Sequence, residues 1–369
     1  MIKKIIERYV QLTRDGQYYV GKSPFSDSEL PLLVVDEDTD TFTDISTGIS
    51  GDSVSFIEHL KGVSYDTAQK MINNTKVETE ETEQEKVLKS ICRDAQEYFR
   101  HNMTLKFAQA AVEYLKKRSF SEEDIEKYGF GYAGKYGDKL YKYLLKKYEK
   151  EDILLTGLCK LKDNQPVDLF WNRVMIPIKN AEGEIVAFGG RVLDDGTPKY
   201  INSPESPIFR KRELLYGYHI AKDIKCSAYI ICEGYMDTIS LHKAGFTNAV
   251  ASLGTALTKN QCELLTNKKR VYVLYDSDTA GVNASLKAIP MLEKIGLETI
   301  VVDYSPYKDP DEFIKAEGAE VFYQRVKETK RKGEGFVVEK LIEKNIKDAI
   351  AYLSNKSVTK IKEVTLCIK

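Results

Sequence analysis

Acidic side chains gather in the stretch between residues 229 and 278. Glu233 ends one apolar run, and Asp276 and Asp278 end another. Because Asp276 and Asp278 are two residues apart, an extended backbone sends both carboxylates to one side. Converging carboxylates repel one another unless a cation neutralises them, and hard oxygen ligands suit Mg²⁺ or Mn²⁺. The stretch therefore predicts a divalent-metal site.

The elements around these acids explain how they could meet. Apolar, β-branched runs alternate with helix-like segments at 237–244 and 258–266. This alternation is typical of βαβ units and a parallel sheet, in which ligands bind beyond the carboxyl ends of the strands. A further strand predicted at 298–304 precedes Asp309 and Asp311. An isolated Asp-x-Asp is usually a solvated turn, but several acids at the strand ends of one sheet favour a metal site.

Four short elements of this stretch resemble the Toprim domain of bacterial replicative primases of the DnaG type. They are Glu-Gly-Tyr-Met-Asp from Glu233, Leu-Gly-Thr from Leu253, Asp-x-Asp from Asp276 and Asp-Pro-Asp from Asp309. Toprim domains also occur in topoisomerases and some nucleases, so these elements alone do not select one family.

The sequence upstream of this stretch distinguishes among these families. Three segments resemble the primase polymerase domain: Arg173-Val-Met-Ile-Pro-Ile, Phe188-Gly-Gly-Arg-Val-Leu and Thr197-Pro-Lys-Tyr-Ile-Asn-Ser-Pro-Glu. The resemblance runs from about residue 1 to 314 and is strongest between 173 and 311. It implies an α/β fold, α+β overall, with these parts: a zinc-ribbon-like β domain (1–74), an acidic linker (75–86), a mixed α/β polymerase subdomain (87–225), a Rossmann-like parallel Toprim sheet (226–307) and a C-terminal helical segment (308–369).

The same resemblance implies roles for individual residues. Glu233, Asp276 and Asp278 would hold Mg²⁺ or Mn²⁺ and carry the catalysis, with Asp309 and Asp311 nearby, and Glu233 would also act as general base. Nucleotide and template contacts would come from Arg173, Arg191, Lys199, Tyr200, Asn202 and Lys211. Arg173 is expected to hold the template strand, and Arg191, Lys199 and Lys211 the phosphates. Asp237 starts a predicted helix, so it is either a helix-start acid or a support for the metal ligands.

The first 74 residues keep the frame of the family's zinc ribbon but not its ligands. The family places Cys and His where this chain has Ser23, Ser26, Asp44 and Thr47. One carboxylate does not make a zinc site, so zinc is not expected. The surrounding apolar pattern survives, which favours a ribbon whose hydroxyls bond across the site, against a partly disordered relic.

Two other features have competing interpretations. Residues 139–150 carry five Lys and one Glu interleaved with Tyr. A groove for single strands is one interpretation, and a solvated helix face with Tyr packed inward is favoured over it. Trp171, the sole tryptophan, is predicted to lie in the core rather than to serve as a stacking platform.

Composition agrees with a soluble enzyme. The 369 residues are 42% hydrophobic with a net charge of −1, so affinity for a polyanion must come from local clustering. Six scattered Cys without a C-x-x-C, no signal peptide and no apolar run of about 18 residues predict a cytoplasmic protein that does not span a membrane.

The expected function is template-dependent synthesis of short RNA primers, with single-stranded DNA and ribonucleoside triphosphates as partners. A replicative helicase is a further expected partner, although no segment here resembles the family's helicase-binding domain and the helical subdomain looks shortened. Two alternatives remain: a Toprim nuclease that uses the same metals, and a non-catalytic relative that binds single-stranded DNA.

Overall fold

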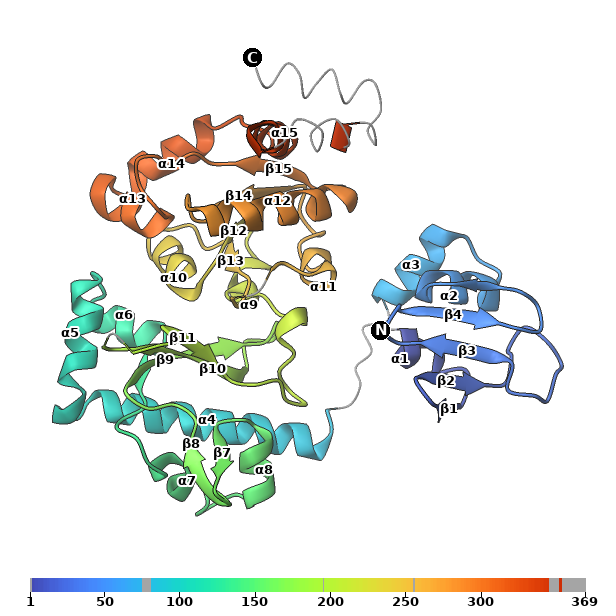
Figure 1. Cartoon of the computed structure of the whole chain (residues 1–369), viewed down its shortest axis with the longest axis horizontal. Coiled ribbons are helices and arrows are strands. Elements are labelled where there is room, and N and C mark those ends of the chain that lie inside the picture. Colours follow the sequence, from blue (N-terminus) through green and yellow to red (C-terminus); the bar gives the residue numbers. More distant parts are fainter. Residues whose placement is uncertain (1, 75–80, 195, 255, 345–351, 354–369) are drawn as a thin grey trace. The chain divides into compact units, whose positions relative to one another are not determined.

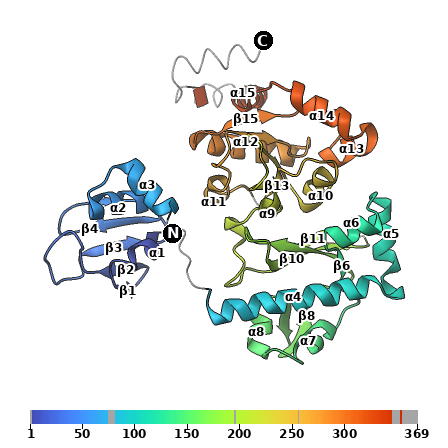
Figure 2. The ribbon, with the colours of Figure 1, turned by 180° about the vertical axis from the view of Figure 1, so that it is seen from behind.

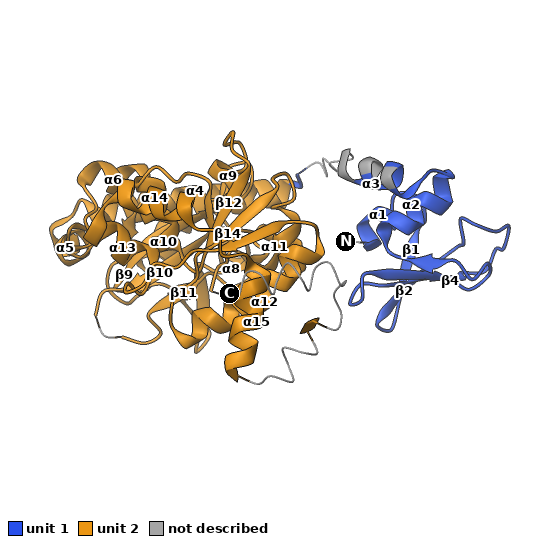
Figure 3. Cartoon of the chain, turned by 90° about the horizontal axis from the view of Figure 1, so that it is seen from above, with its two compact units in different colours: residues 1–82 blue, residues 83–369 orange. Residues whose placement is uncertain are grey.

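The chain forms two compact units, Met1–Thr82 and Glu83–Lys369 (Figure 3). The computed structural model describes residues 2–74, 81–194, 196–254, 256–344 and 352–353. The division between the units falls inside the predicted linker 75–86, of which residues 75–80 lie outside the described residues. The finer domain boundaries predicted within the second unit stay predictions. Within the described residues, no helix has the length and apolar character needed to cross a membrane.

The first unit is a five-stranded antiparallel sheet with helices packed against it. Its elements are α1 (Ile2–Ile6), β1 (Leu12–Asp15), β2 (Tyr18–Gly21), β3 (Leu33–Asp36), β4 (Thr41–Asp44), β5 (Ser50–Gly51), α2 (Ser53–Lys61) and α3 (Tyr65–Asn74). Phe42 and Phe56 meet edge-on in a core that also buries Leu33 and Val35. The apolar spacing of Ile2, Ile5, Ile6 and Val10 predicts a first helix over residues 2–12. The helix ends at Ile6 instead, and Leu12 pairs with Gly21 of β2.

The second unit contains the expected parallel sheet, in the order β13-β12-β14-β15 (Figure 1). The strands are β12 (Ala228–Cys232), β13 (Ala249–Ala251), β14 (Arg270–Val273) and β15 (Glu298–Val301). All of β12 is buried, and alternate residues enter two different apolar clusters, so both faces of the sheet are covered. One face packs against α10 (Tyr235–Lys243) and α13 (Pro310–Glu317); the other packs against α11 (Lys259–Glu263), α12 (Thr279–Lys294) and α15 (Gly333–Lys344).

A second, antiparallel sheet has the order β11-β10-β9-β6. Its strands are β6 (Gly131–Tyr132), β9 (Arg173–Lys179), β10 (Ile185–Val192) and β11 (Tyr200–Asn202). One face shares an apolar cluster with α10, and the other packs on the long helix α4 (Glu83–Met103), which both views show running along this sheet (Figure 1 and Figure 2). The two sheets are therefore joined through one continuous core.

Shorter elements complete the second unit. They are η1 (Lys106–Ala108), α5 (Gln109–Lys117), α6 (Glu122–Lys127), α7 (Lys139–Leu144), α8 (Lys150–Leu155), the hairpin β7 (Cys159–Lys162) and β8 (Gln165–Asp168), η2 (Lys211–Glu213), α9 (Tyr218–Ala221) and α14 (Ala319–Glu328). Of the last helix predicted at 336–350, residues 345–350 lie outside the described residues.

The lysine-rich segment 139–150 has the environment of a solvated helix face. Tyr148 donates its hydroxyl to Asp94, and the ring of Tyr143 lies 5.1 Å from that of Tyr98. Tyr141 and Tyr148 pack against an apolar cluster, as the favoured interpretation had it, whereas Tyr143 is 39% exposed. The prediction for Trp171 is wrong: this side chain is 46% exposed, because Phe170 takes the neighbouring core position at 2%.

Arg173 has a different environment from the predicted template contact. The residue is buried, and its guanidinium donates to the backbone carbonyls of Gly190, Lys199 and Pro198 at 3.0, 3.3 and 2.9 Å. These bonds tie the start of β9 to β10 and to the approach to β11. The guanidinium is thus engaged in fixing the sheet rather than presented to a ligand.

Replacing Arg173 by Met should lower the free energy of unfolding by about 2 kcal/mol or more, because hydrogen bonds of a charged group contribute about 1.5–3 kcal/mol and buried carbonyls lose their donor. Denaturant unfolding followed by the fluorescence of Trp171 measures the change. The control is Arg210→Met, since Arg210 is exposed and, within the part of the chain that the structure describes, pairs with Glu213 alone at 3.4 Å. A variant as stable as the parent but weaker in binding single-stranded DNA would restore the template role.

Candidate metal and nucleotide site

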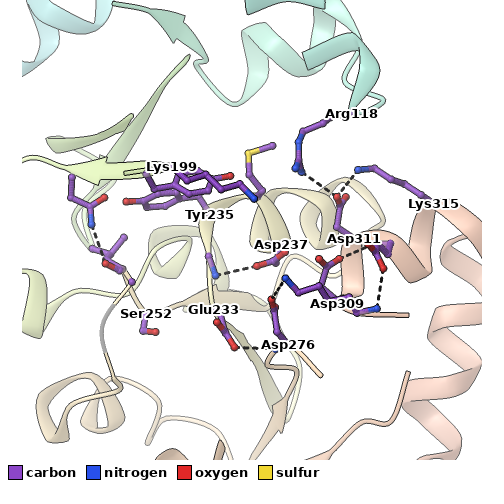
Figure 4. A pocket seen from close by; sticks show the side chains of 18 of the residues that line it. Arg118, Lys199, Glu233, Tyr235, Asp237, Ser252, Asp276, Asp309, Asp311 and Lys315 are labelled. Carbon is purple, nitrogen blue, oxygen red and sulfur yellow. Dashed lines mark hydrogen bonds and ion pairs between the residues drawn. The ribbon is translucent and has the colours of Figure 1, made fainter. Parts of the chain in front are cut away.

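Four of the predicted acids, Glu233, Asp276, Asp309 and Asp311, lie together at one edge of the parallel sheet (Figure 4). Glu233 follows β12 directly, and Asp276 follows the neighbouring strand β14. The backbone N–H of Asp276 donates to Glu233 Oε1 at 3.0 Å, which fixes the two loops against each other. Burial, and then the charge of Asp276, raise the pKa of Glu233 above its usual range.

Asp278 plays a local structural role at the same edge. Its Oδ1 accepts the backbone N–H groups of Ala280 and Gly281, both at 3.0 Å, and so caps α12. The N–H of Gly281 holds the pKa of Asp278 below its usual range. Only glycine fits at 281, since a Cβ there would lie 2.0 Å from the carbonyl oxygen of Asp276 and 2.7 Å from Glu233 Oε1.

Lys308 is the cation that the chain itself supplies to this cluster. Its ammonium lies 3.3 Å from Asp276 Oδ2 and 3.6 Å from Asp278 Oδ2, and its side chain is 53% exposed. Ser277 anchors the backbone of this lysine, because its N–H and hydroxyl both donate to the Lys308 carbonyl. Sequence reasoning did not assign Lys308 a role, although it directly precedes the predicted acid Asp309.

Asp237 supports the edge from the first turn of α10. Its Oδ2 accepts the backbone N–H of Gly234 at 3.1 Å, which holds the turn after Glu233. Burial, and then the charges of Asp309 and Asp276, raise the pKa of Asp237 to about 8. Both interpretations of Asp237 therefore have support. Asp237 lies in the first turn of α10, and the charges of neighbouring carboxylates raise its pKa.

The donor set fits a hard divalent cation. Burial raises the pKa of Asp276, so its ionised form gains from a nearby positive charge. Among the described residues, no three Asp, Glu, His or Cys side chains already stand at metal-binding geometry. Instead, Lys308 lies between Asp276 and Asp278. Glu233, Asp276 and Asp278 are the residues that would hold Mg²⁺ or Mn²⁺.

Glu233 and Asp276 line one part of a cleft of about 640 Å³ whose other lining residues include cations. Of the predicted nucleotide-binding residues, the cleft is lined by Lys199, Tyr200, Asn202 and Lys211. Lys199 is exposed and forms no ion pair within the part of the chain that the structure describes. Burial lowers the pKa of Lys211, and the amide of Asn202 donates to the Leu253 carbonyl at 3.0 Å. Thr255 of the Leu-Gly-Thr element lies outside the described residues.

Arg191 stands behind this lining rather than in it. Its Nε donates to the Tyr114 hydroxyl at 3.0 Å, and its guanidinium lies 5.1 Å from the centroid of the Tyr200 ring. Tyr200 does line the cleft. Arg191 therefore acts on the cleft by holding Tyr200 in place.

Two further cleft cations, besides Lys308, were missed by sequence reasoning. Arg118 and Lys315 both line the cleft and both pair with Asp311. Asp309, by contrast, caps α13 by accepting the N–H of Glu312 at 2.8 Å. Arg118 and Asp311 are 193 residues apart, so no local pattern could have paired them; the Asp-x-x-x-Lys spacing of 311 and 315 on a helix was the one available signal.

In the first unit, the four positions expected to replace zinc ligands carry a hydrogen-bonded cluster. Fully buried Asp44 accepts through Oδ1 from the Ser46 hydroxyl at 2.5 Å and from the N–H and hydroxyl of Thr47, both at 2.9 Å. Ser46 in turn bonds the hydroxyl of Ser26 at 2.8 Å. Ser23 accepts the N–H of Phe25 at 3.0 Å.

Three family models match the chain. They are described as CHC2 zinc finger (residues 1–87), DNA primase catalytic core, N-terminal domain (98–222) and Toprim-like (230–314). The first match does not support the expectation that zinc is absent. The other two agree with the expected polymerase and Toprim regions.

Individual proteins and solved structures that are similar to this chain are also primases. A DNA primase of Clostridium acetobutylicum is 35% identical over 338 residues, 88% of this chain and 56% of that protein, so the chain spans little more than half of this relative's length. The crystal structure of the Aquifex aeolicus primase zinc-binding and RNA polymerase domains matches with a TM-score of 0.67 and 30% identity, covering 100% of this chain and 93% of that one. A DnaG primase catalytic domain bound to single-stranded DNA matches with a TM-score of 0.65 and 31% identity, covering 77% and 93%.

Replacing Lys308 by Met should lower the melting temperature in chelator, because Asp276 would lose the cation that faces it. The same change should increase the affinity for Mn²⁺, which would no longer compete with the ammonium, and should enlarge the rise in melting temperature on adding metal. Calorimetric titration with Mn²⁺ and thermal melts measure both effects, with Lys287→Met on the exposed side of α12 as the matched control. A melting temperature unchanged in chelator would show that Lys308 is only a surface charge.

Proposed function

This chain belongs to the DnaG-type family of bacterial DNA primases, and we propose that it synthesises short RNA primers on single-stranded DNA by metal-assisted nucleotidyl transfer. The observation that carries this proposal is the composition of one cleft. Glu233 and Asp276 line it together with Lys199 and Lys211. Carboxylates for a divalent cation beside cations for a triphosphate are what nucleotidyl transfer requires.

The proposed reaction forms one bond and breaks one. The 3′-hydroxyl oxygen of the first nucleotide or growing primer attacks the α-phosphorus of an incoming ribonucleotide, and the bond from that phosphorus to pyrophosphate breaks. Glu233 accepts the hydroxyl proton; burial beside Asp276 raises its pKa, which makes it a stronger base. A bound divalent metal would lower the pKa of the hydroxyl and neutralise the leaving pyrophosphate. Lys199 and Lys211 hold the phosphates in line.

An exposed aromatic pair supports template binding on the same unit. The ring of Trp171 lies 5.8 Å from that of Tyr136, edge to face, and both side chains are about half exposed. The ammonium of Lys162 lies 5.7 Å from the Tyr136 centroid. Aromatic faces beside a cation are suited to stacking unpaired bases, whatever their sequence. The partner of this surface is therefore proposed to be the single-stranded template.

A gel assay with single-stranded template, labelled ATP, the other ribonucleotides and Mg²⁺ tests the function. A primase yields short ribo-oligomers. A Toprim nuclease would yield template fragments without nucleotides, and a non-catalytic relative would only shift the template band. A replicative helicase as partner stays a prediction.

Asp276→Asn should reduce primer synthesis by at least about 100-fold, because a ligand of the catalytic metal is lost. Its melting temperature in chelator should not fall, since burial already disfavours the ionised carboxylate. Asp223→Asn is the control, because this acid is exposed beside α9 and its one ion pair among the described residues is with Lys222 at 3.5 Å. Normal synthesis by Asp276→Asn would remove the metal-site assignment.

We further propose that the first unit keeps the ribbon fold without zinc. Burial alone would raise the pKa of Asp44, but the neighbouring hydroxyls of Ser23, Ser46 and Thr47 hold it below its usual range. A carboxylate stabilised by hydroxyls supports the two loops that the family joins through a metal. The apolar core around Phe42 and Phe56 adds the stability that a small ribbon otherwise takes from its metal.

Elemental analysis of the full chain should therefore find much less than one zinc per molecule. Amide hydrogen exchange in strands β3 and β4 should be the same with and without chelator, whereas Asp44→Leu should lose protection there. A matched gain-of-site variant, S23C/S26C/D44C/T47C, should bind Co²⁺ with the visible spectrum of a tetrahedral thiolate site, because the four positions are held near one point. One zinc per wild-type chain that resists chelator would overturn the proposal.

A further inference from the structure

Among the contacts of the described residues, Asp311 differs from the other acids of the cleft in having both carboxylate oxygens engaged. The residue is 8% exposed. Its Oδ1 accepts the hydroxyl of Ser240 at 2.5 Å, and its Oδ2 accepts the guanidinium of Arg118 at 3.4 Å and the ammonium of Lys315. A metal ion could reach this carboxylate only by displacing two cations and a hydroxyl. Asp276, by contrast, faces one exposed lysine.

The three partners come from separate elements. Arg118 directly follows α5, Lys315 lies one turn beyond Asp311 on α13, and Ser240 lies on α10. The Arg118 guanidinium also rests 5.6 Å from the Tyr114 ring centroid. Arg118 is thus held from two sides, by a carboxylate and by an aromatic ring, and both supports are partly buried.

The charges of this cluster do not cancel. Two cations share one carboxylate, which leaves one net positive charge beside the cleft that Arg118, Asp311 and Lys315 all line (Figure 4). A guanidinium has five N–H donors, and one of those of Arg118 is directed at Asp311. An ion pair that only stabilised the fold would need neither a second cation nor a position in the lining of the cleft.

We infer that Arg118 and Lys315, oriented by Asp311, form a phosphate-binding pair that receives the triphosphate of the incoming nucleotide or the pyrophosphate that leaves. Arginine binds phosphate oxygens through a planar fork and lysine as a point charge, and both act best when their orientation is fixed beforehand. Asp311 is then a positioning residue and not a metal ligand. The inference rests on the proposed function, because that function supplies the phosphate ligand.

Titration calorimetry with full-length protein separates the sources of phosphate. Arg118→Met and Lys315→Met should each weaken binding of Mg²⁺-pyrophosphate by about 10-fold or more, the loss typical of one charge-assisted contact. Binding of a single-stranded DNA oligomer should change less than about 2-fold. Arg118→Lys should recover part of the affinity, and Arg210→Met, an exposed arginine beside η2, is the control.

Asp311→Asn tests the positioning role. It should weaken pyrophosphate binding while leaving the affinity for Mn²⁺ within about 2-fold of the parent, whereas Asp276→Asn should lose Mn²⁺ binding. Loss of Mn²⁺ binding in Asp311→Asn would overturn the inference. Two other results would also overturn it. A lower melting temperature in Arg118→Met with unchanged pyrophosphate affinity would show that the cluster only stabilises the fold. Weakened binding of DNA alone would show that the cluster contacts the template.

These measurements need no catalytic turnover. A protein that binds pyrophosphate through Arg118 and Lys315 but makes no primers would contradict the proposed function and leave the phosphate site in place. If Arg118→Met and Lys315→Met both keep primer synthesis and normal pyrophosphate affinity, the phosphate site would be contradicted and the proposed function would stand.

Discussion

Repulsion between carboxylates is the constraint on which this cleft depends. The order β12-β14-β15 brings the ends of three parallel strands, and the acids that follow them, to one edge of a sheet. Each acid is stabilised by a different local device: Asp278 and Asp309 by the first N–H groups of helices α12 and α13, Asp311 by two cations, and Asp276 by Lys308. Glu233 and Asp276 keep raised pKa values in spite of these devices. The ionised forms of Glu233 and Asp276 therefore still carry an electrostatic cost. A cation bound beside these two acids would stabilise the folded protein most.

The scaffold can hold these acids because it is rigid on both sides. β12 is wholly buried between two apolar clusters, so Glu233 cannot retreat into solvent by moving its strand. The close approach of α12 at Gly281 presses the Asp276 loop against Glu233. Arg173 does similar work in the antiparallel sheet, where it holds the segment that carries Lys199. Packing and backbone hydrogen bonds thus oppose the electrostatic tendency of the site to open.

How much of the fold and the site could be predicted from the sequence depended on how far apart in the chain the interacting residues are. The parallel sheet and its acids followed from strand and helix periodicity, because connection rules place successive strand ends together. Pairs across the fold, such as Arg118 with Asp311, had no local signal. Trp171 was misassigned because residue type does not tell which way a side chain points: a tryptophan can lie outside while its neighbour Phe170 is buried. For the same reason the sequence did not show that Arg173 bonds backbone carbonyls, and its template role stays a prediction. The first helix was predicted too long, since apolar spacing there did not reveal that Leu12 pairs with Gly21.

The arrangement of charge in the cleft also bears on the order in which ligands bind. The chain has a net charge of −1, so no general field draws a triphosphate toward it, and the carboxylates of Glu233 and Asp276 repel one at short range. Lys199, Lys211 and the Arg118–Lys315 pair line the cleft and attract the phosphates, whereas Lys308 is the cleft cation that pairs with Asp276. A divalent cation between the acids and the phosphates would turn the repulsion into attraction on both sides. Under the proposed function, metal and nucleotide therefore bind with positive coupling, and by linkage each raises the affinity of the other by the same factor.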